Sequence, residues 1–462
     1  MAKITIDTKP IRQLWPGVFK NLTPSRILVL GFGAVILIGG LLLTIPAVSR
    51  NGQPLRFLDA LFTSTSAVCV TGLVVVDTGI HYSTLGHFII IALIQTGGLG
   101  IMTMSTLIAL LLGRRIGLKG RILIQESFNQ FSLAGLVRLI INVLIVTAIF
   151  EFTGGLILSL RFLADFPPAR AFAFGFFHSI SAFCNAGFDL FGQVFGPYSS
   201  ISHYVSDWTV ILTVGGLVVC GGLGFPVIME LAKYPKTRHL SLHAKMALSI
   251  SFLLILSGAI LIFLFEINNP KTLGMLNPAG KFLGVLYQSI TPRTAGFNSL
   301  DISQMRIATW FILIVFMFIG ASPSSTGGGV KTTTIGVLLA TIFATVRGKQ
   351  DVELFERRFP QDLINRAFTL TFIALVWVCL VTLVMTLAEP YTFIRLLFEV
   401  TSAFGTVGLS TGITPSLSDI SKILLILTMF IGRVGPLTVM IAITDVEHKP
   451  SGRFITDRVM IG

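Results

Sequence analysis

The hydrophobic residues of this chain fall into long runs that alternate with short mixed segments. Four runs with few charged positions lie at residues 27–48, 139–160, 246–265 and 367–387. Four more apolar runs lie at residues 87–112, 209–231, 310–345 and 423–444. A helix needs ~20 apolar residues to cross a bilayer core. The pattern therefore predicts an all-α integral membrane protein with eight full transmembrane spans.

A third kind of segment separates the two runs of each pair and repeats along the chain. Its four copies read LFTSTSAVCVTGL, FFHSISAFCNAGF, LYQSITPRTAGF and LFEVTSAFGTVGL. Each has an aromatic residue, then a hydroxyl-bearing residue, and closes on a glycine followed by Leu or Phe. The closing glycines are 115, 109 and 112 residues apart. A fixed period indicates internal repeats, which we place at residues 27–115, 138–233, 245–346 and 364–445.

The middle segment of each repeat contains about a dozen helix-like residues, too few to span a core that takes ~20. We therefore expect a re-entrant pore helix whose C-terminal end lies at membrane depth. Irregular backbone is tolerated there only when it is buried in protein or lines water. Each repeat has an even number of full crossings, so the four copies are parallel and can surround one central pore. Inverted-repeat transporters require the opposite parity.

Composition agrees with a membrane protein. The 462 residues are 53% hydrophobic and 12% charged, with a mean hydropathy of +0.85. A soluble chain carries about 25% charged residues, so a disordered chain, a collagen-like fibre and a disulfide scaffold are excluded. The four cysteines form no C-x-x-C pair, which gives no sign of a redox or zinc motif.

The net charge of +13 is explained by topology. Of the 34 basic residues, 22 lie in five places: the N-terminus, the three connections between repeats, and the C-terminal tail. The positive-inside rule places these segments, including residues 1–26 and 446–462, in the cytoplasm of a multi-pass protein of the plasma membrane. Nucleic-acid binding is disfavoured because the cations are spread over short loops rather than gathered on one domain. The first hydrophobic run is long enough to span, so no cleavable signal sequence is expected.

Four strips of backbone end the pore helices and are candidates for a selectivity filter that binds K⁺. Strip 1 is Val70, Thr71 and Gly72; strip 2 is Asn185, Ala186 and Gly187; strip 3 is Thr294, Ala295 and Gly296; strip 4 is Thr406, Val407 and Gly408. A ring of carbonyls can replace the water shell of a dehydrated cation. Glycine lets the backbone turn and adds no side chain to the path. Most glycines in such a chain are helix caps or packing contacts, but recurrence in register sets these four apart.

The motifs AVCVTGL, AFCNAGF, TPRTAGF and AFGTVGL, in this order and spacing, resemble those of the Trk/Ktr/HKT superfamily of potassium transporters. The bacterial Ktr-type membrane subunit is the most similar type, and the resemblance covers residues 27–446. It implies a potassium-uptake homodimer regulated by a cytosolic ring of nucleotide-binding subunits. In that superfamily glycine in all four filter positions goes with potassium selectivity. This chain departs from strict symmetry in its third repeat, whose pore segment is one residue shorter and carries Pro292 and Arg293.

The second run of repeat 3 contains a candidate gate. Its ten residues, which we call the intramembrane loop, are Gly320, Ala321, Ser322, Pro323, Ser324, Ser325, Thr326, Gly327, Gly328 and Gly329. Proline and glycine interrupt a helix, so we expect a break below the filter, with a simple kinked helix as the alternative. A phosphate-binding loop is excluded because Val330, not glycine, precedes Lys331. The break also resembles the Ktr pattern, in which such a loop acts as a gate.

Two cationic residues complete the candidate gate. Lys331 follows the loop, and Arg433 lies in the last apolar run. A guanidinium at mid-membrane costs at least ~2.5 kcal/mol, so we expect Arg433 to bind carbonyls of the broken helix. Ktr-type proteins carry an arginine in this motif, read as a partner of the loop. The alternative is a residue that snorkels to the cytoplasmic surface.

Three acidic residues need an interpretation, and two of them keep two. Glu151 lies in a membrane span, where an acid is a functional candidate or a packing contact. Asp59 reads as the N-cap of the first pore helix. Glu399, on the fourth pore helix, either attracts cations to the outer mouth or holds that helix by a hydrogen bond. Cys69 and Cys184, three residues before the glycines, are expected to pack behind the filter.

These features favour a transporter over an enzyme, because the spans contain no nucleophile and base pair, no H-E-x-x-H and no paired acids. The transported ion is K⁺, and no organic cofactor is expected. Na⁺ acts either as an activator or as a coupled ion of a symporter, and the sequence leaves both open. No nucleotide-binding glycine motif follows a strand, so any response to a nucleotide requires another subunit.

Overall fold

The computed structural model describes residues 23–100, 103 and 136–443, and these are mostly helical, with a single two-stranded hairpin among them. The first helix of each repeat corresponds to an expected apolar span: α1 (Pro24–Leu43), α7 (Leu136–Phe162), α12 (Leu242–Glu266) and α16 (Gln361–Ala388). Among the described residues these four helices are long and apolar enough to cross a membrane unbroken. Their outer faces are apolar; Phe252 of α12 is 68% exposed and Leu383 of α16 is 63% exposed. Such surfaces are stable only against lipid.

The pore helices are α2 (Phe57–Val68), α8 (Pro168–Phe183), α13 (Pro278–Ile290) and α17 (Phe393–Gly405). They contain 12 to 16 residues, so none can cross a core about 30 Å thick at ~1.5 Å per residue. They lie inside the molecule, where Phe62, Tyr287 and Phe398 have no exposed surface. The expected fold class, four repeats of helix, pore helix and helix, is confirmed.

The structure corrects the expected second spans, which are not continuous. They begin with α4 (Thr84–Leu99), α10 (Trp208–Leu223), α14 (Ile307–Phe318) and α18 (Asp419–Val434). The chain bends by 102° from α10 into α11 (Phe225–Thr237) and by 96° from α18 into α19 (Pro436–Ile443). Repeat 3 breaks at the intramembrane loop, as expected, and resumes as α15 (Thr332–Val346).

Glycine explains these breaks. Gly100, Gly224 and Gly435 end α4, α10 and α18 with φ of 84°, 91° and 96°. That conformation is easy for glycine and terminates a helix. An uninterrupted apolar run records hydrophobicity but not direction, so the apolar runs at residues 209–231 and 423–444 do not show the bends that the structure has there. The residues that follow α4 in the expected span 87–112 lie largely outside the described part of the chain.

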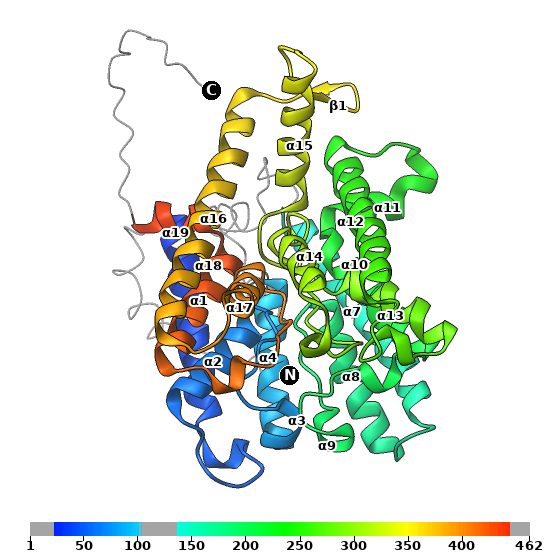
Figure 1. The fold of residues 1–462 in the computed structure, drawn as a ribbon, viewed down its shortest axis with the longest axis vertical. Helices are drawn as coiled ribbons and strands as arrows, with labels where there is room; N and C mark the ends of the chain where they lie inside the picture. Colours follow the sequence, from blue (N-terminus) through cyan, green and yellow to red (C-terminus); the bar gives the residue numbers. More distant parts are fainter. Residues whose placement is uncertain (1–22, 101–102, 104–135, 444–462) are drawn as a thin grey trace, which may run out of the picture.

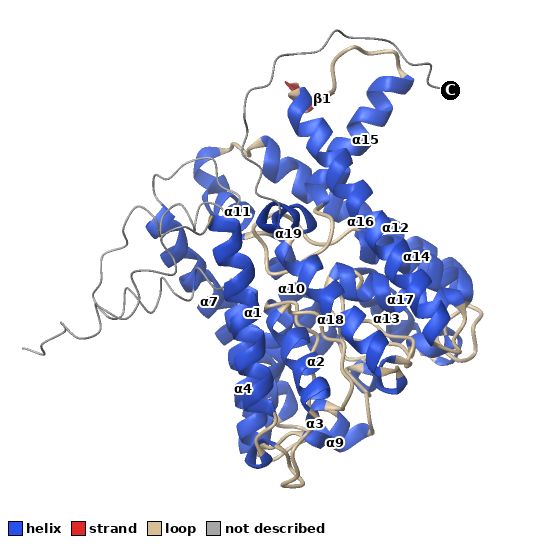
Figure 2. Cartoon of the chain, turned by 90° about the vertical axis from the view of Figure 1, so that its left-hand side faces the viewer, coloured by secondary structure: helices blue, strands red, loops and turns tan. Residues whose placement is uncertain are grey.

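The four repeats surround one axis in sequence order. The second helix of each repeat packs on the pore helix of the next: α4 on α8, α10 on α13, α14 on α17, and α18 on α2. Repeat 1, in blue, and repeat 4, in orange and red, therefore lie side by side although they are opposite ends of the chain (Figure 1). We call the two ends of the molecule the α9 end, with α3 (Thr78–His81) and α9 (Gly192–Phe195), and the α15 end, with the hairpin of β1 (Glu353–Leu354) and β2 (Arg357–Arg358) (Figure 2).

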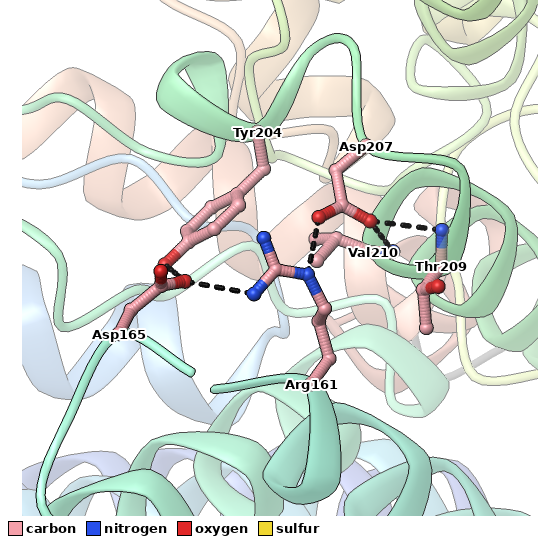
Figure 3. A network of polar contacts seen from close by, with 6 residues as sticks. All are labelled: Arg161, Asp165, Tyr204, Asp207, Thr209 and Val210. Carbon is pink, nitrogen blue, oxygen red and sulfur yellow. Dashed lines mark hydrogen bonds and ion pairs between the residues drawn. The ribbon is translucent and has the colours of Figure 1, made fainter. Parts of the chain in front are cut away.

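A polar network at the α9 end joins the two long helices of repeat 2 (Figure 3). Arg161, near the end of α7, donates to Asp207 at 2.5 Å, and Asp207 accepts two backbone N–H groups at the start of α10 at 2.9 and 3.1 Å. Arg161 also contacts Asp165 at 3.0 Å, and the hydroxyl of Tyr204 donates to the same carboxylate at 3.0 Å. The network caps α10 and fixes the place where it begins.

A buried ion pair closes the ring between repeats 1 and 4. Lys422 of α18 donates to Asp59 of α2 at 2.8 Å, and the two side chains are 9% and 12% exposed. Asp59 is not the N-cap expected from the sequence, because α2 begins at Phe57 and the carboxylate binds the lysine instead. A second pair, Arg56 and Asp419, joins the same helices but is 65% and 53% exposed.

We expect Asp59→Asn to destabilise the protein much more than Arg56→Gln. Removing one partner of a buried pair leaves an uncompensated charge and costs about 3–5 kcal/mol, whereas water screens an exposed pair, so that its loss changes stability little. Thermal unfolding in detergent, followed for both variants, measures the difference. Equal shifts in melting temperature would show that the buried pair does not hold repeats 1 and 4 together.

Candidate functional site

The four strips share one backbone conformation. The first residues of the strips, Val70, Asn185, Thr294 and Thr406, have φ of 50°, 59°, 71° and 51°. Their glycines, Gly72, Gly187, Gly296 and Gly408, have φ of 92°, 69°, 79° and 91°. The left-handed conformation costs a non-glycine residue roughly 1–2 kcal/mol. Four such residues in register indicate that surrounding contacts impose this shape.

A hydroxyl-bearing residue in each pore segment supplies those contacts: Ser66, Ser181, Thr291 and Ser402. The backbone carbonyl of each accepts the N–H of the middle strip residue, at 2.8, 2.7, 3.0 and 2.8 Å. The hydroxyls of Ser66 and Ser402 accept the N–H of the strip glycine at 3.0 and 3.1 Å. The hydroxyls of Ser181 and Thr291 instead donate to the backbone carbonyl of the residue that follows the strip glycine, at 2.8 and 2.7 Å. The repeated hydroxyl of the sequence pattern therefore fixes the strips.

The strip glycines meet their neighbours around the axis. A Cβ added to the glycine of strip 1 would lie 2.6 Å from the carbonyl oxygen that precedes the glycine of strip 2. A Cβ on the glycine of strip 2 would lie 2.9 Å from the equivalent carbonyl oxygen of strip 3, and a Cβ on the glycine of strip 3 would lie 2.9 Å from that of strip 4. A Cβ on the glycine of strip 4 would overlap the equivalent oxygen of strip 1. The four glycine backbones thus form a closed ring that has no room for a side chain. Such a ring of carbonyls has the chemistry to hold a dehydrated monovalent cation.

A cavity of about 200 Å³ opens on the α9 side of this ring and touches all four strip glycines. Asp77, Asp189 and Asp301 line it. Burial, and then the Asp77 carboxylate, raise the pKa of Asp189 to about 7. Carboxylates at a narrow mouth attract cations. Sequence reasoning missed all three residues, because they lie in loops that have no motif of their own.

The intramembrane loop lies between the ring and a second cavity of about 550 Å³ on the α15 side. Pro323, Ser324 and Ser325 line this cavity together with Lys331 and Arg433. The backbone of the loop is hydrogen-bonded to other repeats: Ser322 and Thr326 donate to carbonyls of Gly222 and Gly221 at 3.0 and 3.2 Å, and Gly329 donates to that of Gly432 at 3.2 Å. Three backbone N–H groups of this irregular segment therefore find acceptors on neighbouring spans, as buried backbone requires.

The two cations hold the carbonyls of the loop. Lys331 donates to the carbonyls of Gly327 at 2.7 Å and Gly328 at 3.4 Å. Arg433 donates to the carbonyl of Thr326 and also to those of Gly97 and Gly98 in repeat 1. The contact expected between Arg433 and the broken helix is thus present, and its guanidinium joins repeats 1, 3 and 4.

The remaining acids occupy structural positions. Glu399 is fully buried, does not line the cavity, and accepts hydrogen bonds from Ser410 at 2.7 Å, the N–H of Thr411 at 2.9 Å and Thr414 at 2.7 Å. These contacts support the interpretation of Glu399 as a residue that holds the segment after strip 4. Glu151 is 8% exposed, accepts from Gln95 at 2.8 Å, and has no cationic partner among residues 23–100 and 136–443.

The cysteines and Arg293 lie behind the strips. Cys69 and Cys184 are fully buried, and Cys184 contacts Gln95 at 3.1 Å. Arg293 is 4% exposed and donates to Ser251 of α12 at 2.8 Å, so its guanidinium does not enter the ring. Within the described residues no three His, Cys, Asp or Glu side chains gather to hold a metal ion.

The sequence matches the cation transport protein family TrkH over residues 22–455. The chain belongs to this family. It is 39% identical to the Ktr system potassium uptake protein B of Bacillus subtilis, over 94% of this chain and 97% of that protein. It is also 39% identical to the potassium/sodium uptake protein NtpJ of Enterococcus hirae, over 96% of this chain and 98% of that protein.

A solved structure confirms the fold at low sequence identity. The crystal structure of the potassium transporter TrkH from Vibrio parahaemolyticus matches with a TM-score of 0.72 and 18% identity, over 93% of this chain and 87% of that one. The resemblance to the Trk and Ktr transporters that the four motifs indicated is confirmed by the family match and by the Ktr relative. The family consists of cation transport proteins, which agrees with the interpretation of the chain as a transporter.

Glycines of the second helices allow the ring to form. Gly97, Gly221 and Gly432 occupy equivalent positions in repeats 1, 2 and 4. A Cβ added to one of them would overlap a backbone carbonyl oxygen at the end of the pore helix in the same repeat. These oxygens belong to Val68, Phe183 and Phe404, respectively, each four residues before the strip glycine. We expect Gly221→Ala to lower thermal stability or prevent folding, since overpacking costs about 1–3 kcal/mol or more.

Gly216 on the same helix provides a matched control. It is exposed, with no atom within 4 Å of an added Cβ. Gly216→Ala should leave stability unchanged or raise it by about 0.5–1 kcal/mol, because glycine weakens a helix. Thermal unfolding and yield of the two variants in detergent measure the contrast. A tolerated Gly221→Ala would contradict the close approach of α10 to the strip.

Proposed function

We propose that this protein takes up K⁺ across the plasma membrane through a selectivity filter made by the backbone carbonyls of the four strips. The closed ring of glycine backbones carries this proposal, because it brings four sets of carbonyls to one axis and excludes side chains from it. The names of the B. subtilis and E. hirae relatives support potassium as the ion. The acidic cavity at the α9 end would collect cations at the entrance.

The orientation follows from charge. Lys233 and Lys236 of α11, and Arg347, Lys349 and Arg358 around the hairpin, belong to the α15 end. By the positive-inside rule this end faces the cytoplasm. Both termini are then cytoplasmic, and the α9 end with its acidic cavity faces outward. Reaction of cysteines introduced at either end with an impermeant thiol reagent tests this orientation.

The intramembrane loop acts as the gate in this proposal. It lies under the ring, and Lys331 and Arg433 place two positive charges at its carbonyls. The loop must leave the axis for an ion to pass from the ring to the cavity of about 550 Å³. The protein works as a homodimer, and the ring of nucleotide-binding subunits implied by the family resemblance would bind at the cytoplasmic end and move the loop.

Coupled transport with Na⁺ is a second candidate, which the name of the E. hirae relative favours. Radioactive K⁺ flux into liposomes, with Na⁺ varied on either side, separates the two. A channel activated by Na⁺ shows K⁺ flux that follows the K⁺ gradient alone. A symporter accumulates K⁺ when the K⁺ concentrations on the two sides start equal and only the Na⁺ concentrations differ.

We expect Gly72→Ser to weaken discrimination against Na⁺ by about tenfold, the equivalent of ~1.4 kcal/mol. Gly72 has φ of 92°, and a Cβ there would meet the carbonyl oxygen of Ala186 at 2.6 Å. The ring must therefore distort, and selectivity depends on the number and field strength of its dipoles. The K⁺/Na⁺ permeability ratio in liposomes measures the effect. An unchanged ratio would overturn the filter assignment.

We expect Arg433→Gln to raise K⁺ flux, because the loop loses charged hydrogen bonds and a positive barrier. A hydrogen bond from a charged donor contributes about 1.5–3 kcal/mol, so flux should rise about tenfold where the loop limits it. Deletion of Gly327, Gly328 and Gly329 should act in the same direction. Flux is measured in liposomes with protein quantified in each preparation. Unchanged flux and unchanged dependence on the regulatory partner would remove Arg433 from the gate.

A further inference from the structure

The intramembrane loop touches three strips through the side chain at the first position of each. Gly328 donates its N–H to the hydroxyl of Thr406, the first residue of strip 4, at 2.9 Å. A Cβ on Gly327 would overlap the hydroxyl of Thr294, the first residue of strip 3. Consecutive residues of the loop thus contact the side chains that the left-handed backbone of the strips places beneath the ring.

Strip 2 meets the loop through an amide. The carboxamide of Asn185 lies 2.9 Å from the hydroxyl of Thr294 and 3.3 Å from the hydroxyl of Thr326, and either orientation of the amide makes both hydrogen bonds. Asn185 therefore joins strip 2 to strip 3 and to the loop at once. All of these side chains are fully buried. A buried donor or acceptor that loses its hydrogen-bond partner costs the full free energy of its desolvation.

Strip 1 differs, because its first residue is Val70, which has no polar atom to offer. Within the described part of repeat 1, the loop is joined to that repeat only indirectly, through Arg433 and the carbonyls of Gly97 and Gly98. Polar contact with the loop is therefore a property of strips 2, 3 and 4. It does not follow from the four-fold repeat itself.

We propose that Thr406 and Asn185 are positioning residues that couple the filter to the loop, so that the position of the loop changes the K⁺/Na⁺ discrimination of the ring. This rests on the proposed function of the strips and the loop. Both residues hold the left-handed conformation, with φ of 51° and 59°, which non-glycine residues keep only when neighbours impose it. When the loop leaves, Thr406 loses its donor and Asn185 loses Thr326, and strips 2 and 4 are then held by their pore-segment hydroxyl residues without the loop, as strip 1 is.

The decisive variant is Thr406→Val, which keeps the shape of the side chain and removes the acceptor. Thr401→Val is the matched control, because Thr401 is buried on the same helix α17 and its hydroxyl has no partner. In the full-length protein in liposomes, Thr406→Val should lower the K⁺/Na⁺ permeability ratio severalfold and Thr401→Val should not. Thr406→Ser, which retains a hydroxyl, should recover most of the ratio.

The same variants in a protein that lacks residues 327–329 test coupling itself. With the loop shortened, Thr406→Val should cause no further change in the ratio, because the contact is already gone. An equal change in both backgrounds would mean that Thr406 acts locally in strip 4, and no change in either would mean that the contact does not matter. Both results overturn the proposal.

Two further measurements keep the test decisive. If Thr406→Val does not fold, the pair Asn185→Ala and Thr326→Val provides the same comparison, and additive effects on the ratio would refute coupling. Gly72→Ser is measured in both backgrounds as a reference. If Gly72→Ser lowers the K⁺/Na⁺ permeability ratio in both backgrounds, the filter assignment stands whatever the result at Thr406. If Gly72→Ser lowers the ratio in neither background, the filter assignment itself is wrong.

Discussion

The close approach of four glycine backbones around one axis is the constraint on which the rest of this structure depends. Carbonyls can form a ring narrow enough to contact a dehydrated ion only if no side chain intervenes. The strip glycines meet this need directly, and the glycines of the second helices meet it one layer further out, where α4, α10 and α18 pass the ends of the pore helices. Two sets of glycines, rather than one, therefore build the site.

That geometry strains the backbone of the strips and leaves polar backbone groups without helical partners, and hydroxyl-bearing residues compensate for both. The strips leave the helical conformation inside the protein, so their N–H and carbonyl groups need partners. Ser66, Ser181, Thr291 and Ser402 provide them in all four repeats. Beyond the strips the repeats differ: Glu399 holds the segment after strip 4, whereas a ring nitrogen of His178 accepts the N–H of Leu190 after strip 2 at 3.3 Å. The symmetry is closest at the strips, where the ion would pass.

The intramembrane loop is the largest departure from four-fold symmetry. It contacts repeats 2, 3 and 4 directly, and Arg433 connects it to repeat 1. Its backbone is held by carbonyls of glycines in α10 and α18, by the hydroxyl of Thr406 and by two cations, and the hydroxyl of Thr326 in the loop bonds to the amide of Asn185. The ten residues of the loop carry little apolar side chain. A segment held by hydrogen bonds and charge, rather than by apolar packing, is one that a modest free energy can move, which suits a gate beneath a rigid ring.

The sequence by itself determined the class of protein, the four repeats, the pore helices and the identity of the strips, because these depend on local hydrophobicity and on a pattern that recurs at a fixed period. It also located the break in repeat 3, since ten small or helix-breaking residues in succession leave little choice. Only the tertiary structure showed that α10 and α18 turn by about a right angle, because one glycine with positive φ changes direction without changing hydropathy. It also reassigned Asp59 from a helix cap to a partner of Lys422, and brought Asp77, Asp189 and Asp301 to one cavity. Those contacts join residues far apart in the chain, and no local pattern records which distant residues will meet.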